Sequence, residues 1–274
     1  MKRLIASLWF ISALTTGTAW AQPFTPNEAG VTMGHWHLNS RDVEANKKIF
    51  VGMGGTASKP GERLQRVTFP GVVVILQLGS AVGPSTGGTI GSVVNHVGFT
   101  VPNVADAVAK WKAAGVAVFP GRNNRADQAF VETPDGLRIE ILENKSQNFP
   151  IQHEHVHFFL PESAIPQSQA WYVKTFGARA SVRGNNSPIA DLPGTQLRFN
   201  KSDTPQVATK GRILDHIGFD VTDLQAFIKK LEAAGIKLDR PYRKQDNGGA
   251  LAFITDPWGT SIELNERPNS AYIN

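Results

Sequence analysis

Apolar and polar residues alternate along three short segments of the chain, and alternation with a period of two predicts β-strands. In one segment Val97, Phe99 and Val101 share one face of the strand, so His96 lies on the opposite face. The other two segments also place histidines opposite apolar side chains. We expect the apolar face of each strand to pack under a helix, with the histidine face pointing away. The segments are residues 96–101, 155–160 and 216–221.

Segments in which apolar residues recur at helical spacing follow these strands. Val104, Val108 and Trp111 have this spacing, and Gly115 ends their segment with a residue suited to a helix C-cap. A comparable segment follows the histidines near the start of the chain. We expect helices over residues 43–50, 105–115, 167–176 and 224–235.

These elements belong to an internal repeat. Residues 94–99 match residues 214–219, and the turn and Glu-bearing strand at 133–140 echo those at 255–263. Two more divergent copies precede these. The repeat unit is a strand, a helix and three further strands, which is a βαβββ module. Four modules are expected, near residues 31–80, 92–145, 152–202 and 212–267.

The spacing of the histidines indicates that the chain is a duplicated half. His35 and His96 are 61 residues apart, as are His155 and His216, and each member of the first pair lies 120 residues before its counterpart. The sequence therefore predicts two domains of two modules each, separated by the polar stretch 145–150. The expected domains are residues 31–146 and 152–267.

The first residues have the form of a secretory signal peptide. Lys2 and Arg3 form a positive start, residues 4–13 are apolar, and Ala19-Trp20-Ala21 has the small-x-small form of a cleavage site. The apolar run is too short for a membrane anchor. We expect removal of residues 1–21 and an exported, periplasmic or extracellular protein.

Composition narrows the range of partners. The 274 residues are 41% hydrophobic and 19% charged, as in a globular protein with a core. Signal removal lowers the formal charge by two, from +5 to +3, and this weak excess without a basic run argues against nucleic-acid binding. No long apolar window beyond the signal predicts a membrane span. A small-molecule partner is expected, with the chain a monomer or a homo-oligomer.

The histidines suggest a metal site. Glu140 and Glu263 lie on strands whose apolar neighbours face the other way, so both carboxylates share the histidine face. Such groups are costly to bury without partners. Two imidazoles and a carboxylate match the open ligand set of a divalent metal, and without cysteine any ligand must be His, carboxylate or amide. The alternative is a buried His–Glu hydrogen-bond network. All seven histidines lie on first strands of modules: His35, His37, His96, His153, His155, His157 and His216.

Three runs, at residues 96–99, 216–219 and 256–263, resemble the vicinal oxygen chelate superfamily. This superfamily includes glyoxalase I, extradiol dioxygenases, methylmalonyl-CoA epimerase and the fosfomycin and bleomycin resistance proteins. The resemblance covers nearly the whole chain after the signal. It implies an α+β fold, in which four tandem βαβββ modules pair into two cup-shaped, partly open mixed β-sheet barrels with helices on the outside.

The resemblance also implies ligand sets, because family members carry their metal ligands on the first and last strands of paired modules. Four modules in one chain resemble the extradiol layout, in which the C-terminal pair holds the metal, and this favours the second set. By position, the first set is His35, His96 and Glu140, and the second is His155, His216 and Glu263.

Four further positions are singled out by the resemblance. Gln77 is a possible fourth ligand of the first set, since glyoxalase-type sites use an oxygen from such a strand. Arg198 is its expected counterpart in the second half and could hold a substrate carboxylate or phosphate, although a surface ion pair is the alternative. Phe253 stands where the extradiol signature has Tyr, and Tyr242 is a possible substitute in substrate binding.

The function implied is that of an exported divalent-metal-dependent enzyme acting on a small substrate with vicinal oxygens. The resemblance covers both a glyoxalase-like lyase or isomerase and an extradiol-type dioxygenase, with one Fe2+, Mn2+, Zn2+ or Ni2+ ion per site. The alternatives are a metal-free protein that sequesters a small molecule, as in the bleomycin resistance branch, and a structural protein with residual histidines. No residue beyond the ligands is assigned to catalysis.

Overall fold

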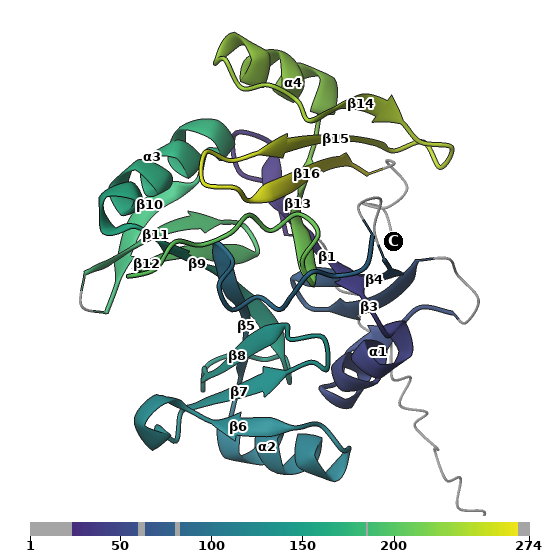
Figure 1. Cartoon of the computed structure of the whole chain (residues 1–274), viewed down its shortest axis with the longest axis vertical. Helices are drawn as coiled ribbons and strands as arrows, with labels where there is room; N and C mark the ends of the chain where they lie inside the picture. The colour runs from purple at the N-terminus through teal and green to yellow at the C-terminus, as the bar shows by residue number, and fades with distance from the viewer. Residues whose placement is uncertain (1–23, 60–63, 80–82, 185, 268–274) are drawn as a thin grey trace, which may run out of the picture.

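The computed structural model describes residues 24–59, 64–79, 83–184 and 186–267 (Figure 1). The expected signal peptide, residues 1–21, lies outside these ranges. In the described ranges, none of the helices has the length and apolar character that a bilayer crossing requires.

Four βαβββ modules follow one another along the chain, as the repeat predicts. The first contains β1 (Val31–Ser40), α1 (Val43–Gly52), β2 (Thr56–Ala57), β3 (Gln65–Phe69) and β4 (Val72–Leu78). The second contains β5 (Val94–Val101), α2 (Val104–Ala113), β6 (Val118–Pro120), η1 (Arg122–Asn124), β7 (Gln128–Glu132) and β8 (Arg138–Glu143). The third contains β9 (Gln152–Leu160), η2 (Glu162–Ala164), α3 (Ile165–Phe176), β10 (Arg179–Arg183), β11 (Ser187–Leu192) and β12 (Thr195–Lys201). The fourth contains β13 (Leu214–Val221), α4 (Leu224–Ala233), β14 (Arg240–Lys244), β15 (Ala250–Thr255) and β16 (Ser261–Glu266).

The helix ends follow from local capping. Asp42, Asn103 and Asp223 accept hydrogen bonds from backbone N–H groups in the first turns of α1, α2 and α4, which stabilises those ends. Gly115 and Gly235 follow α2 and α4 with φ of +80° and +78°, a left-handed conformation that glycine adopts without strain. The four predicted helices are present, and the C-capping glycines lie just beyond them.

Two separate eight-stranded sheets contain the sixteen strands of the described residues. One has the order β14-β15-β16-β13-β1-β4-β3-β2, so it joins the fourth module to the first. The other has the order β10-β11-β12-β9-β5-β8-β7-β6 and joins the third module to the second. At the centre of each sheet two first strands run antiparallel, β1 with β13 and β5 with β9. In Figure 1 the purple β1 accordingly lies beside the green β13. The α+β fold is as expected, and the sheets are open, not closed barrels.

The predicted pairing of modules is wrong. The expected domains, residues 31–146 and 152–267, would each contain one sheet, whereas each sheet takes one module from each half. The polar stretch 145–150, expected to separate the domains, lies in the short link between β8 and β9, which both flank β5 in the same sheet. The longer links, residues 79–93 and 202–213, are the ones that cross between the sheets.

These two crossover links run side by side. The backbone N–H of Val93 donates to the carbonyl of Val207, whose own N–H donates to Gly91, each over 2.9 Å. Further along, the N–H of Ile213 donates to the carbonyl of Gly87 over 2.9 Å. Each link therefore satisfies the backbone groups of the other, and this pairing stabilises the exchange of modules between the sheets.

The core lies on the helix faces of both sheets. Trp36 on β1 packs against Phe99 on β5, with 5.2 Å between ring centroids, and the indole N–H of Trp111 on α2 donates to the carbonyl of Met53, which caps α1. Modules adjacent in sequence thus pack through their helix faces. The opposite face of each sheet carries six of the seven histidines, and His153 is the exception.

Candidate metal centres

Two groups of histidine and glutamate side chains lie on the central strands, one in each sheet. In each group the possible ligand atoms all lie within 4.8 Å of one another. The β1/β13 cluster consists of His35, His37, His216 and Glu263. The β5/β9 cluster consists of His96, His155, His157 and Glu140.

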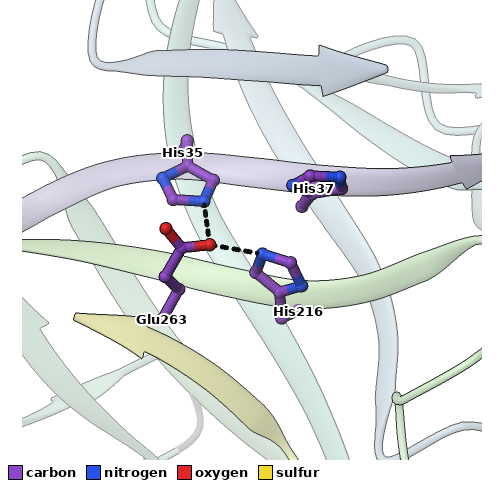
Figure 2. Close-up of side chains that lie close together, drawn as sticks. All are labelled: His35, His37, His216 and Glu263. Atoms are coloured by element: carbon purple, nitrogen blue, oxygen red, sulfur yellow. Dashed lines mark hydrogen bonds and ion pairs between the residues drawn. The ribbon is translucent and has the colours of Figure 1, made fainter. Parts of the chain in front are cut away.

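Glu263 is the centre of the β1/β13 cluster (Figure 2). Its Oε2 lies 2.9 Å from His216 Nε2 and 3.6 Å from His35 Nε2. Figure 2 shows His35 and His37 on the same strand, and the ring of His37 lies 4.5 Å from that of His216. Three imidazoles from two antiparallel strands thus surround one carboxylate from β16.

The β5/β9 cluster repeats this arrangement with the equivalent residues. Glu140 Oε2 lies 3.3 Å from His96 Nε2 and 3.1 Å from His155 Nε2. His157 Nδ1 lies 3.0 Å from His96 Nε2. The duplication has therefore produced two similar centres, each built from both halves of the chain.

Two glycines make room for the imidazoles. His35 lies opposite Gly218 in the β1–β13 register, and a Cβ atom on Gly218 would come within 2.0 Å of His35 Cε1. Gly98 stands in the same relation to His155, where the distance would be 1.9 Å. The His-x-Gly pattern of β5 and β13 therefore has a steric cause: the glycine lets a ring from the neighbouring strand lie across it.

Residues preceding three of the histidines orient the rings. His216 Nδ1 lies 2.7 Å from an oxygen of Asp215, and His155 Nδ1 lies 2.6 Å from an oxygen of Glu154. His96 Nδ1 has an amide oxygen, that of Asn95, at 2.9 Å. A proton held on Nδ1 by such a partner leaves the lone pair of Nε2 pointing into the cluster, which is the usual arrangement around metal-ligating histidines.

Gln77 lies at the β1/β13 cluster, where its Oε1 is 3.2 Å from His37 Nε2. Its counterpart is Asn200, because Gln77 pairs with Asn39 on β1 and Asn200 pairs with Phe159 at the equivalent point of β9. Asn200 Oδ1 lies 3.0 Å from His157 Nε2. The expectation that Arg198 is the counterpart of Gln77 is wrong, because the β-strand register differs from the one assumed.

Arg198 lies beside the β5/β9 cluster and is buried, so it does not form the surface ion pair that was the alternative. Its Nη2 makes an ion pair with Glu154 and a hydrogen bond of 3.0 Å to Gln196. Its Nη1 lies 3.9 Å from Glu140 Oε2 and has no hydrogen-bond partner in the described residues. Arg198 and Glu140 both line a cavity of 370 Å³.

The two aromatic positions on β14 and β15 differ in their placement. Tyr242 is partly buried and packs against the hydrophobic core, and its part in substrate binding stays a prediction. Phe253 does lie at the β1/β13 cluster, with its ring 5.2 Å from that of His216. An apolar ring therefore stands where the extradiol signature has a phenol.

Burial and charge set the protonation of the clusters. Burial, helped by the neighbouring imidazoles, lowers the pKa of His37 to about 3. Burial also lowers the pKa of His96 to about 4, against the raising effect of Glu140. Burial acts to raise the pKa of Glu263, but the imidazoles of His216 and His35 outweigh it and hold that pKa well below its usual range. Burial also acts to lower the pKa of His216, but Asp215 and Glu263 outweigh it and raise that pKa. Neutral imidazoles beside an ionised carboxylate are the forms that bind metal, so a metal at the β1/β13 cluster would compete with a proton on His216.

One unpaired atom in each cluster indicates that the donor set fits a metal. The Nε2 atoms of His35 and His155 are buried and lack a hydrogen-bond partner in the described residues. Buried polar atoms in folded proteins are normally satisfied. A pure His–Glu hydrogen-bond network leaves both atoms unexplained, whereas a divalent cation held by three imidazoles and a carboxylate would occupy them.

The structure redistributes the predicted ligands between the centres. His35 lies with His216 and Glu263, and His155 lies with His96 and Glu140, so neither predicted triad is assembled. The predicted triads failed because each was built from the modules of one half.

Two members of the clusters, His37 and His157, were absent from the predicted ligand sets. Each stands two residues after a predicted ligand, and therefore on the same strand face. The alternation in the sequence contained this signal. His153, by contrast, lies on the core side, with its ring 5.0 Å from that of Trp36.

Comparisons with known proteins agree with this fold. Residues 155–264 match the profile of the Glyoxalase/Bleomycin resistance protein/Dioxygenase superfamily. Glyoxalase I from Zea mays is 17% identical with a TM-score of 0.67, over 89% of this chain and 94% of that chain. A protein described as a dioxygenase from Bacillus subtilis is 12% identical with a TM-score of 0.64, over 90% of this chain and 87% of that chain.

A comparison with curated protein sequences gives no match. The profile match covers the third and fourth modules, and the structural likeness extends over all four. Residues 155–264 therefore match the Glyoxalase/Bleomycin resistance protein/Dioxygenase superfamily, and the chain as a whole has the tandem fold seen in glyoxalase I.

Proposed function

We propose that this protein is a divalent-metal-dependent enzyme that acts on a small substrate with vicinal oxygens. The observation that carries the proposal concerns the buried Nε2 atoms of His35 and His155. Each lies 3.6 Å or 3.1 Å from a carboxylate oxygen in a cluster of three imidazoles, yet makes no hydrogen bond in the described residues. Metal binding would satisfy both atoms at once, and a second cluster of the same composition makes a chance arrangement improbable.

The ligands would be the members of the two clusters. In the β1/β13 cluster Gln77 is close enough to His37 to orient it, and Asn200 does the same for His157. A metal held by these residues would supply Lewis-acid chemistry toward substrate oxygens. The carboxylates and amides of the chain then hold the imidazole protons on the outer nitrogens and keep the inner ones free.

The residues around Phe253 favour a glyoxalase-like lyase or isomerase over ring cleavage. A phenylalanine has no proton to exchange with a substrate, and residues 241–249 contain no histidine to replace it. Proton transfer beside a carbonyl needs only a base within reach of the substrate. A carboxylate from the clusters meets this requirement.

A metal-free binding protein is the second candidate, as in the bleomycin resistance branch. It has one observation in its favour, the hydrogen bonds that join Glu263 to His216 and Glu140 to His96 without any ion. It provides no partner for the Nε2 atoms of His35 and His155.

Elemental analysis of the purified mature chain, residues 22–274, tests the proposal. We expect about two divalent ions per chain after exposure to Fe2+, Mn2+, Zn2+ or Ni2+. His35→Ala and His155→Ala should each lose one of them. Binding near zero with every metal would refute the enzyme proposal and leave the binding protein.

We propose in addition that the protein is exported. The form of residues 1–21 supports this. N-terminal sequencing of the protein from its source cells should find Gln22 as the first residue. Retention of Met1 in the cell fraction would contradict export.

A further inference from the structure

The two clusters consist of the same types of side chain, three histidines and a glutamate, but the residues around them differ. Strand register places Arg198 opposite His157 in one sheet, and Ile75 opposite His37 at the same point of the other. Gln128 lies on β7, the strand that pairs with the strand of Glu140, and Leu251 occupies the equivalent position on β15 of the other sheet. At these two points the β5/β9 cluster therefore has polar or cationic neighbours, and the β1/β13 cluster has apolar ones.

Hydrogen bonds hold the guanidinium of Arg198 in place but leave its Nη1 atom without a hydrogen-bond partner in the described residues. Glu154 and Gln196 bind its Nη2, and Gln196 also accepts from its Nε over 3.3 Å. The side chain is buried, yet its Nη1 has no hydrogen-bond partner in the described residues. A guanidinium N–H that is buried and unpaired costs free energy unless a ligand completes it.

The unpaired nitrogen belongs to a cavity of 370 Å³ that reaches the β5/β9 cluster. Arg198, Glu140 and His157 line it together with two further arginines, Arg125 and Arg183. Asp127 already pairs with Arg125 through a contact of 2.6 Å. The cavity is of the size that takes a small molecule.

Three arginines and one carboxylate, that of Glu140, line this cavity. Arg125 pairs with Asp127, and Arg198 pairs with Glu154, which also contacts His155. The guanidinium of Arg183 and the Nη1 atom of Arg198 would both gain a partner from a guest with negative charge.

We propose that the β5/β9 cluster is a substrate site for a small 2-oxo or 2-hydroxy carboxylate, whose acid group binds Arg198 and Arg183. This inference rests on the proposed function, because the second oxygen of the substrate would reach the metal position. Arg198 Nη1 lies only 3.9 Å from the Glu140 carboxylate. A small substrate whose carboxylate binds Arg198 could therefore reach the metal ligands with its second oxygen. The β1/β13 cluster, with Ile75 and Leu251 at the equivalent points, lacks this selection for charge.

The test compares L-lactate with propane-1,2-diol, which has the same vicinal oxygens without the acid group. Broadening of the ligand methyl resonance by Mn2+-loaded protein reports binding beside the metal. Saturation-transfer NMR reports binding to the metal-free protein. We expect lactate to bind at least about tenfold more tightly than the diol, as one charge-assisted hydrogen bond implies.

Arg198→Met should remove this preference while the metal content stays at its wild-type value. Ile75→Met places the same residue at the equivalent point of the other cluster and should leave the preference intact. If Arg198→Met does not fold, Arg183→Met decides, because Arg183 is exposed and its loss should still weaken lactate binding several-fold.

Equal binding of lactate and diol, or an unchanged preference in the folded arginine variants, would overturn the inference even with both metals present. Absence of metal in the wild type would instead refute the proposed function. In that case saturation transfer from the metal-free protein still shows whether Arg198 selects an anion.

Discussion

The absence of a side chain at Gly218 leaves room for the His35 ring in the β1/β13 cluster. Because a Cβ atom there would lie 2.0 Å from the ring of His35, Gly218→Ala should displace that ring and abolish metal binding at the β1/β13 cluster. Elemental analysis should find about half the wild-type metal content, since the β5/β9 cluster is untouched. Gly98→Ala is the matched change in the other sheet, with a Cβ atom 1.9 Å from the ring of His155, and it should remove the ion of the β5/β9 cluster instead. A Gly218→Ala protein that retains both ions would show that His35 is not a ligand.

At the same scale, Asp215 tests the role of the residue that precedes a ligand. Asp215→Asn keeps the hydrogen bond to His216 Nδ1 but removes the charge, so metal affinity at the β1/β13 cluster should fall by about tenfold or more. A chelator competition with Zn2+ measures this. Asn95→Asp is the reverse change beside His96 and should strengthen the other site. Equal affinities in all three proteins would exclude an electrostatic role for these neighbours.

At the scale of elements, Tyr172 on α3 connects the two sheets. Its hydroxyl donates to Asp256 Oδ2 over 2.8 Å, and both side chains are buried. Tyr172→Phe leaves this carboxylate oxygen without a donor, so the free energy of unfolding should fall by about 1–3 kcal/mol in urea titrations. The matched change Tyr242→Phe, at a half-buried ring, should alter it by less than about 0.5 kcal/mol. Similar losses in both variants would contradict this role of the contact.

The predictable part of the fold is also found at this scale. Alternation correctly gave the shared face of His96, His155, His157 and His216, whereas His153 lies on the core side, beyond a register irregularity between β5 and β9. Asn103 and Asp223 cap the helices that follow β5 and β13. Strand partners could not be predicted, because modules with the same pattern on the same face can pair in either combination. The equal spacings between histidines are compatible with both combinations of modules. Every predicted ligand is therefore in a cluster, but the predicted triads combine residues of different clusters.

At the scale of the whole molecule, the exchange of modules makes the halves interdependent. A fragment of residues 22–147 contains β1 and β5, but each is half of a different sheet and lacks its antiparallel partner. The repeat allows β1 of one copy to pair with β5 of another, with Gly98 taking the place of Gly218 opposite His35. We therefore expect this fragment to form a homodimer, measured by light scattering.

In that homodimer His35 and His37 of one copy would join His96 and Glu140 of the other. The triad predicted from the sequence, His35, His96 and Glu140, would then exist, but between two chains. Mixing the fragment with residues 148–274 during refolding should instead give a one-to-one complex that binds about two ions, as the intact chain does. A monomeric fragment that folds cooperatively and binds metal would show that the two modules of one half can form a sheet together. The crossover links would then be the reason that the intact chain pairs modules from different halves.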